Sequence, residues 1–126
     1  MKTMSKEAAE KQYNIPSSVI DALIRYNRIR VKGKEMQLVV SDLDELNHLS
    51  ISNFEPLRGK RITVGSAAKK YGIPKGTIWN WAHRGILAST KEGTHRYLDE
   101  AEIAYAAALR REGLIVQKKI MQELWK

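Results

Sequence analysis

The side chains best suited to polar recognition are concentrated in one short segment, residues 75–84. A helix here buries a stripe at i, i+3 and i+4, which is made by Ile78, Trp81 and Ala82. Its opposite face carries Lys75, Trp79, Asn80 and His83. A cation, an amide, an imidazole and an indole on one face are suited to hydrogen bonding and stacking with a ligand.

Catalytic and metal-binding patterns are missing from the chain. The three histidines, His48, His83 and His95, have no HExxH spacing and no acidic cluster beside them, and neither a Gly-rich phosphate loop nor a serine elbow is found. The absence of cysteine excludes disulfides and thiolate zinc sites. We therefore expect no enzyme activity, no metal and no cofactor, and we interpret His83 and His95 as ligand contacts.

The elements that position the 75–84 face read as two short helices around a tight turn, starting at Ile62. Ala67 and Ala68 allow the first helix to approach its neighbour closely, and Gly72 can take the left-handed conformation that ends it. Pro74 then lies near the first turn of a second helix from about Lys75 to Arg84, which ends at Gly85. This spacing is that of a helix-turn-helix.

A small hairpin and a further helix are predicted after residue 85. Ile86–Ala88 reads as a strand, Lys91–Gly93 as a turn and Thr94–Leu98 as the returning strand, so the hairpin forms a wing. Asp99 followed by Glu102 resembles a capping box at the start of a helix from Glu100 to about Arg111.

These residues resemble the winged helix-turn-helix domains of the MerR regulators and of excisionase-type DNA-binding proteins. The shared pattern is T-V-x-x-A-A-x-x-x-G-I-x-x-x-T-I-x-x-W-x-x-x-G-I-L, followed by Gly and His-Arg-Tyr on the wing and by an acidic helix start. It covers roughly 50 of the 126 residues. The resemblance implies binding of double-stranded DNA, and its excisionase side implies an architectural variant in which several copies lie side by side and bend the duplex.

In such a domain the second helix enters the major groove and the wing contacts the backbone or the minor groove. The expected DNA contacts of helix and wing are Lys75, Gly76, Thr77, Trp79, Asn80, His83, Arg84, Lys91, His95 and Arg96. Asn80 and Lys75 are expected to read base edges, and Arg96 with His95 to anchor the wing. Trp79 either stacks on a sugar or thymine methyl or covers the base of the wing; Tyr71, Trp81 and Tyr97 are expected in the core.

The distribution of charge agrees with a polyanionic partner. The net charge is +8, and residues 58–98 hold nine Lys and Arg against the single acid Glu92, while the segments on either side are balanced. A merely solvated basic surface is the alternative. The excess of positive charge coincides with the predicted helix-turn-helix, which favours nucleic acid as the partner.

The first 50 residues read as a divergent copy of the same unit, with a period of about 58 residues and one residue inserted around Gln12. Asp21 and Ala22 replace the outward Trp79 and Asn80. A basic cluster remains at Arg25, Arg28, Arg30, Lys32 and Lys34. Either this copy binds DNA through its wing, with Arg28, Arg30 and Lys32 as contacts, or it is a protein-contact domain.

Two connecting segments complete the organisation. Residues 51–61 have the composition of a linker, in which Arg58, Lys60 and Arg61 form a phosphate clamp or are simply solvated. Residues 113–126 form an amphipathic helix whose apolar half is Leu114, Val116, Ile120, Met121, Leu124 and Trp125. This half either serves self-association or a partner helix, or it folds back onto its own domain.

The sequence thus predicts a mainly α fold with small β-hairpin wings: two tandem winged helix-turn-helix domains, 1–50 and 62–112, and a C-terminal amphipathic helix. The expected function is sequence-specific binding of double-stranded DNA, as a transcriptional regulator or an excisionase-like architectural factor. The alternative is an adaptor in partition, packaging or recombination, whose first domain and tail bind a protein such as a recombinase or polymerase. No apolar run approaches 18 residues and no signal core is present, so we expect a cytoplasmic, nucleoid-associated protein without membrane contact.

Overall fold

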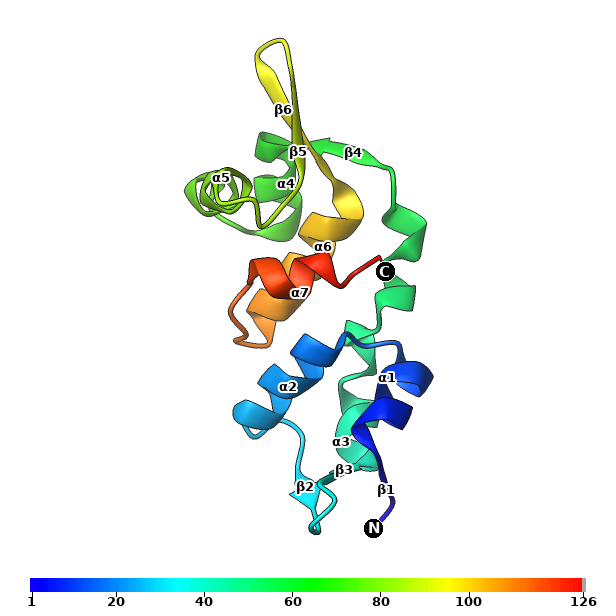
Figure 1. Ribbon diagram of the computed structural model, residues 1–126. Coiled ribbons are helices and arrows are strands. Elements are labelled where there is room, and N and C mark those ends of the chain that lie inside the picture. The colour runs from blue at the N-terminus through cyan, green and yellow to red at the C-terminus, as the bar shows by residue number, and fades with distance from the viewer. Residues whose placement is uncertain (126) are drawn as a thin grey trace. The chain divides into compact units, whose positions relative to one another are not determined.

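A computed structural model describes residues 1–125 of the chain, which divides into two units (Figure 1). The first unit comprises Met1–Asn53 and the second begins at Phe54. Each unit is described by itself below.

The first unit combines short helices with a three-stranded antiparallel sheet. Its elements are β1 (Thr3–Met4), α1 (Lys6–Tyr13), α2 (Ser17–Arg25), β2 (Val31–Lys32), β3 (Gln37–Val39), α3 (Val40–Glu45) and the 3-10 turns η1 (Asn47–Leu49) and η2 (Ile51–Asn53). The strands pair in the order β1-β3-β2. Hydrophobic side chains of the helices and of β3 form the core.

The second unit has the same kinds of element in a similar order. They are η3 (Glu55–Leu57), β4 (Arg61–Thr63), α4 (Val64–Tyr71), α5 (Lys75–His83), β5 (Ser89–Glu92), β6 (His95–Asp99), α6 (Glu100–Arg111) and α7 (Lys118–Gln122). The strands pair in the order β4-β6-β5, all antiparallel. The predicted helix-turn-helix, wing and following helix are therefore present, and in Figure 1 the β5–β6 hairpin extends away from α4 and α5.

Helix α6 is the centre of the second unit. Nine of its twelve residues, from Glu100 to Leu109 with the exception of Glu102, are buried, which is the pattern of a helix covered on nearly every side. Several of them are alanines, so neighbouring elements approach its backbone closely. Tyr105 is fully buried, and the ring of Phe54 packs edge-on against it at a centroid distance of 4.9 Å.

Local sequence explains why α4 and α5 form and where they stop. The Thr63 hydroxyl caps α4 by accepting from the Ser66 N–H at 3.2 Å. Gly72 ends α4 with a φ of 65°, a left-handed conformation that glycine adopts without steric cost. Pro74 occupies the N-cap position of α5, so the turn between the helices needs only three residues.

The first strand of the wing begins three residues later than predicted, at Ser89 instead of Ile86. The end of α5 explains the difference. Gly85, at a φ of 72°, donates to the carbonyl of Ala82, and Ile86 donates to the carbonyl of Trp81 at 2.9 Å, which is a Schellman motif. This motif turns Ile86 and the following leucine into the core, where both are buried, so neither lies in the hairpin.

The sequence analysis did not predict one strand of each sheet, β1 in the first unit and β4 in the second. These strands are only two and three residues long and lie before the first helix of their unit. In the second unit Arg61–Thr63 pairs with β6 in the register Ile62 to Leu98. Arg61 was assigned to a linker, but it belongs to this sheet. The predicted linker is also shorter at its other end, because Phe54 is already part of the second unit.

The C-terminal segment differs from the predicted helix of residues 113–126, the last of which lies outside the described residues. Only Lys118–Gln122 is helical, because Gly113 ends α6 at a φ of 79° and an extended stretch follows. The side chains expected to drive self-association are buried within the chain: Leu114, Val116, Ile120, Met121 and Leu124 are at most 8% exposed, and Trp125 is half-buried under the Arg58 guanidinium. The structure therefore favours the fold-back alternative.

A carboxylate joins α6 to the helix-turn-helix. Glu100 is 7% exposed and accepts from the Lys70 ammonium and the Tyr71 hydroxyl, each at 2.5 Å. These two hydrogen bonds, led by that from Lys70, lower the pKa of Glu100. Burial raises the pKa of Tyr71, and its bond to the carboxylate raises it further. Tyr71 is half-buried, not a core residue as predicted.

Removal of the Glu100 charge should destabilise the second unit in a pH-dependent way. Because its folded-state pKa is depressed, Glu100 contributes stability above its unfolded-state pKa and loses it as pH falls through the folded-state value. Glu100→Gln should lower the unfolding free energy by about 1 to 3 kcal/mol at pH 7 and by less near pH 3. Urea denaturation of both proteins at the two pH values measures this, and equal differences at both would contradict it.

Candidate nucleic-acid interface

The four residues predicted on the outward face of α5 are all exposed. Ile78 and Trp81 are buried and Ala82 is half-buried, whereas Lys75, Trp79, Asn80 and His83 are exposed. Glycine at position 76 is also exposed, and Thr77 is half-buried. Four adjacent polar or aromatic side chains are thus available on one side of a nine-residue helix.

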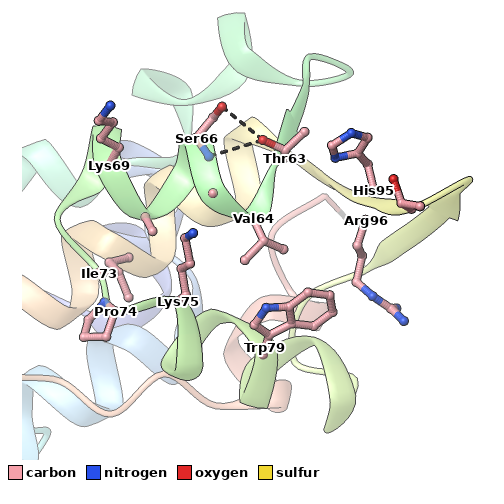
Figure 2. A pocket seen from close by; sticks show the side chains of 13 residues that line it. Thr63, Val64, Ser66, Lys69, Ile73, Pro74, Lys75, Trp79, His95 and Arg96 are labelled. Carbon is pink, nitrogen blue, oxygen red and sulfur yellow. Dashed lines mark hydrogen bonds between the residues drawn. The ribbon is translucent and has the colours of Figure 1, made fainter.

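A groove of about 820 Å³ lies between α4, α5 and the turn of the wing (Figure 2). Its walls are made by Thr63, Val64, Gly65, Ser66, Ala68, Lys69, Ile73, Pro74, Lys75, Trp79, Thr94, His95 and Arg96. The lining contains two lysines, an arginine and a histidine and no carboxylate. Its electrostatic character suits an anion.

Lys75 lies in this groove instead of pointing away along the free face of α5. A Cβ added to Gly65 would be 3.8 Å from Lys75 Cε and 4.0 Å from Nζ, so the lysine stem crosses the first turn of α4 where that helix has no side chain. Figure 2 shows its ammonium directed toward α4, with Lys69 on the same helix. Both lysines line the groove, together with residues of the first turn of α4, whose N-terminal end is positive.

The two wing residues expected to contact DNA leave β6 on opposite faces, as strand alternation requires. His95 is exposed and its ring lies 6.3 Å from that of Tyr97 on the same face. Tyr97 is half-buried, with the Arg61 guanidinium 4.0 Å from its ring centroid, and is not the core residue predicted. Arg96 shares the other face with the buried Leu98.

Arg96 consequently does not extend from the hairpin. Its guanidinium carbon is 5.3 Å from the centre of the Trp79 ring, and Nη1 donates to the Ser89 hydroxyl at 2.8 Å. Its Nε–H is buried and has no acceptor among the described residues. The predicted projection of the Arg96 side chain away from the hairpin is wrong, because the side chain folds back onto α5.

Trp79 agrees with the second of its two interpretations, as a cover for the base of the wing. The residue is 38% exposed. Its ring stacks on His83 at a centroid distance of 6.0 Å and an interplanar angle of 29°, and the Arg96 guanidinium lies over it. The indole thus contacts the wing while part of its face remains accessible.

Most of the predicted cationic clamp before α4 is engaged within the protein. Arg61 forms an ion pair with Glu92 at 2.7 Å, and Arg58 lies 3.7 Å from Glu55 and over the Trp125 ring at 4.5 Å. Lys60 is exposed. Arg84 at the end of α5 and Lys91 on the wing are exposed and have no ion-pair partner in residues 1–125.

The first unit presents a different surface at the corresponding helix. Asp21 on α2 forms an ion pair with Lys6 at 2.6 Å, and Ala22 is buried. Arg30, predicted as a DNA contact, binds Asp42 through Nε and Nη2, both at 3.0 Å, which lowers the pKa of Asp42. The other two predicted contacts, Arg28 and Lys32, are exposed.

Nine of the thirteen groove residues were not predicted as site residues, among them Thr63, Gly65 and Lys69. Lys69 could have been found from the sequence, because it extends the basic segment on the first helix. Gly65 could not, because the close approach of Lys75 to it depends on the angle between α4 and α5. Within residues 1–125 no group of three His, Cys, Asp or Glu is placed to hold a metal ion. No helix of that part is long and apolar enough to cross a membrane.

Comparison with known proteins agrees with this geometry. Residues 62–116, a little under half of the chain, match the model of a family described as a helix-turn-helix domain. No curated protein and no solved structure matches the chain. Residues 62–116 are therefore similar to a helix-turn-helix domain, in agreement with the two short helices and the tight turn between them.

Proposed function

We propose that the second unit binds double-stranded DNA by placing α5 in the major groove and the wing beside it. The observation that carries this proposal is the exposed polar face of α5 next to a carboxylate-free groove with two lysines. A nine-residue helix fits the width of the major groove, and the groove between helix and wing offers a path for the phosphate backbone between them.

The geometry supports different roles for residues that the sequence grouped together. Asn80 is exposed on the free face of α5 and is suited to pair with an adenine edge. Lys75 and Lys69 face the groove and are suited to phosphate oxygens. His95, Lys91 and Arg84 are exposed around this surface and complete the backbone contacts, and His83 with Trp79 lines the edge of the helix.

In this proposal the protein acts as a sequence-specific regulator or as an architectural factor that bends DNA with several copies side by side. Leu114, Val116, Ile120, Met121 and Leu124 of the C-terminal segment are buried, so contacts between neighbouring copies would use other surfaces in this arrangement.

The first unit is proposed as a second copy of the same domain. The two sheets have the same strand order, and α1 and α4 are both eight residues long. Ala9 and Ala67 are both fully buried at equivalent places 58 residues apart, so no inserted residue near Gln12 is needed. The returning strands β3 and β6 are offset by 60 residues, because the wing of the first unit is two residues shorter.

Ion pairs in the first unit support an adaptor role for it as a second candidate function. The outward position of α2 holds the pair Asp21–Lys6, and the Arg30 charge is neutralised by Asp42. A surface with these pairs offers less attraction to a polyanion than that of the second unit. The first unit would then contact a protein such as a recombinase, polymerase or partition factor while the second unit holds DNA.

Binding should depend strongly on salt. If Lys69, Lys75, Arg84 and Lys91 each neutralise one phosphate, log affinity should fall with log salt at a slope of roughly −4. Fluorescence anisotropy with duplex DNA at several salt concentrations measures the slope. A slope near −1 would contradict a DNA-tracking surface.

Asn80 and Lys75 should respond differently to truncation. Asn80→Ala should cost about 1 to 3 kcal/mol of discrimination between a selected site and random DNA, because it removes a base contact. Lys75→Ala should weaken both DNAs equally, because it removes a phosphate contact. Affinities for sites selected from genomic fragments and for random duplexes decide this, and equal losses for Asn80→Ala would assign it to the backbone.

Charge reversal in the first unit separates the two functions proposed for it. With Arg28→Glu and Lys32→Glu in the full chain, an adaptor role predicts unchanged DNA affinity, whereas DNA binding by the first wing predicts a loss of tenfold or more. Lys91→Glu on the second wing is the matched positive control. Loss in both proteins would exclude the adaptor role as the sole function of the first unit.

A further inference from the structure

We propose that Arg96 is a positioning residue that holds the wing against α5, and that it does not itself contact DNA. This proposal rests on DNA binding by the second unit. It assigns a structural role to Arg96, for which the sequence pattern predicted a direct contact with DNA.

The contacts of Arg96 connect the two parts that must reach DNA together. Its backbone lies in β6, its Nη1 binds Ser89 in β5, and its guanidinium lies over Trp79 in α5. Trp79 is held in turn by stacking on His83, one turn farther along α5. A continuous row of side chains therefore runs from the exposed face of the helix to the base of the wing, as Figure 2 shows for Trp79 and Arg96.

The chemistry of arginine favours this fixed position. A planar guanidinium stacks on an indole and donates in its own plane at the same time, which a lysine ammonium cannot reproduce. The guanidinium lies over the Trp79 ring and donates to the Ser89 hydroxyl, so a swing toward a phosphate would break both contacts. The exposed side chains of Lys91 and His95 remain available for the DNA backbone.

Asn80 immediately follows Trp79. How firmly the Trp79 indole is held therefore affects the position of Asn80, the residue proposed to read bases. Fixing Trp79 from the wing side sets the distance between a base contact and the wing contacts. We therefore expect Arg96 to influence specificity through geometry.

The free protein provides the first test. Hydrogen exchange of the β5 and β6 amides should be faster in Arg96→Ala than in wild type, because the hairpin loses its attachment to α5. Lys91→Ala is the control, since Lys91 lies directly opposite Arg96 in the hairpin and its side chain is exposed. Equal exchange in wild type and Arg96→Ala would overturn the proposal, whether or not the chain binds DNA.

The second test uses the salt dependence of DNA binding. Arg96→Ala should lower affinity about three- to thirtyfold at one salt concentration without changing the salt slope. Lys91→Ala should reduce the magnitude of the slope by about 0.9, as loss of a phosphate contact does. The same reduction for Arg96→Ala would show a direct phosphate contact and overturn the proposal. A wild-type chain without salt-dependent binding would instead overturn the proposed function.

Coupling between Arg96 and Trp79 completes the test. Trp79→Leu combined with Arg96→Ala should weaken binding no more than the stronger single variant, because both remove one contact. Fully additive losses would contradict a shared role. If Arg96→Ala does not fold, Arg96→Lys takes its place in these tests. A positioning role predicts that Arg96→Lys loses DNA affinity, whereas a direct phosphate contact predicts that lysine retains the affinity.

Discussion

Left-handed backbone at Gly72 and Gly85 is the constraint on which the second unit depends. The first of these residues ends α4 and permits a three-residue turn, and the second ends α5 and returns the chain to the core. Because α5 is bounded at both ends, its exposed face has one orientation relative to α4 and the wing. A side chain with a Cβ at either position would meet a strained φ even where space is available, as at Gly72.

The first unit meets the same constraint with asparagine. Asn14 and Asn27 have φ values of 51° and 59° and lie 58 residues before the two glycines. Asparagine is the residue after glycine that best tolerates this conformation. Asn27 also ends α2 with the hydrogen bonds of a Schellman motif, from Arg28 N–H to the Leu23 carbonyl and from Asn27 N–H to that of Ile24. The two units thus have similar turn geometry at these positions, while the outward side chains of α2 and α5 differ.

Local signals in the sequence were sufficient for α5 and α6, but not for the C-terminal helix or for the segments between helices. The apolar spacing of Ile78 and Trp81 and the Asp99 cap predicted α5 and α6 to within a residue, because both signals act within one turn. The strand β4 has only three residues and gains stability from pairing with β6, which no local pattern encodes. The predicted capping box is correct for one of its two residues. The Asp99 carboxylate accepts from the Ala101 N–H and caps α6, but the Glu102 carboxylate accepts from the Ala88 N–H instead of the N-cap N–H. The orientation of Arg96 was likewise set by a partner on another element.

Formal charge overstates what a DNA-binding surface offers, and the second unit shows why. Its basic segment contains arginines and lysines that the fold itself uses: Arg61 with Glu92, Lys70 with Glu100, and Arg96 with Trp79. A paired cation brings its carboxylate with it, so its field at a phosphate is weakened, and moving it to DNA would cost the intramolecular contact. The cations left without a partner in the described chain, such as Lys69, Lys75 and Lys91, border the groove or the wing. Placement of the free charges, and not the total of +8, therefore determines where a polyanion can bind.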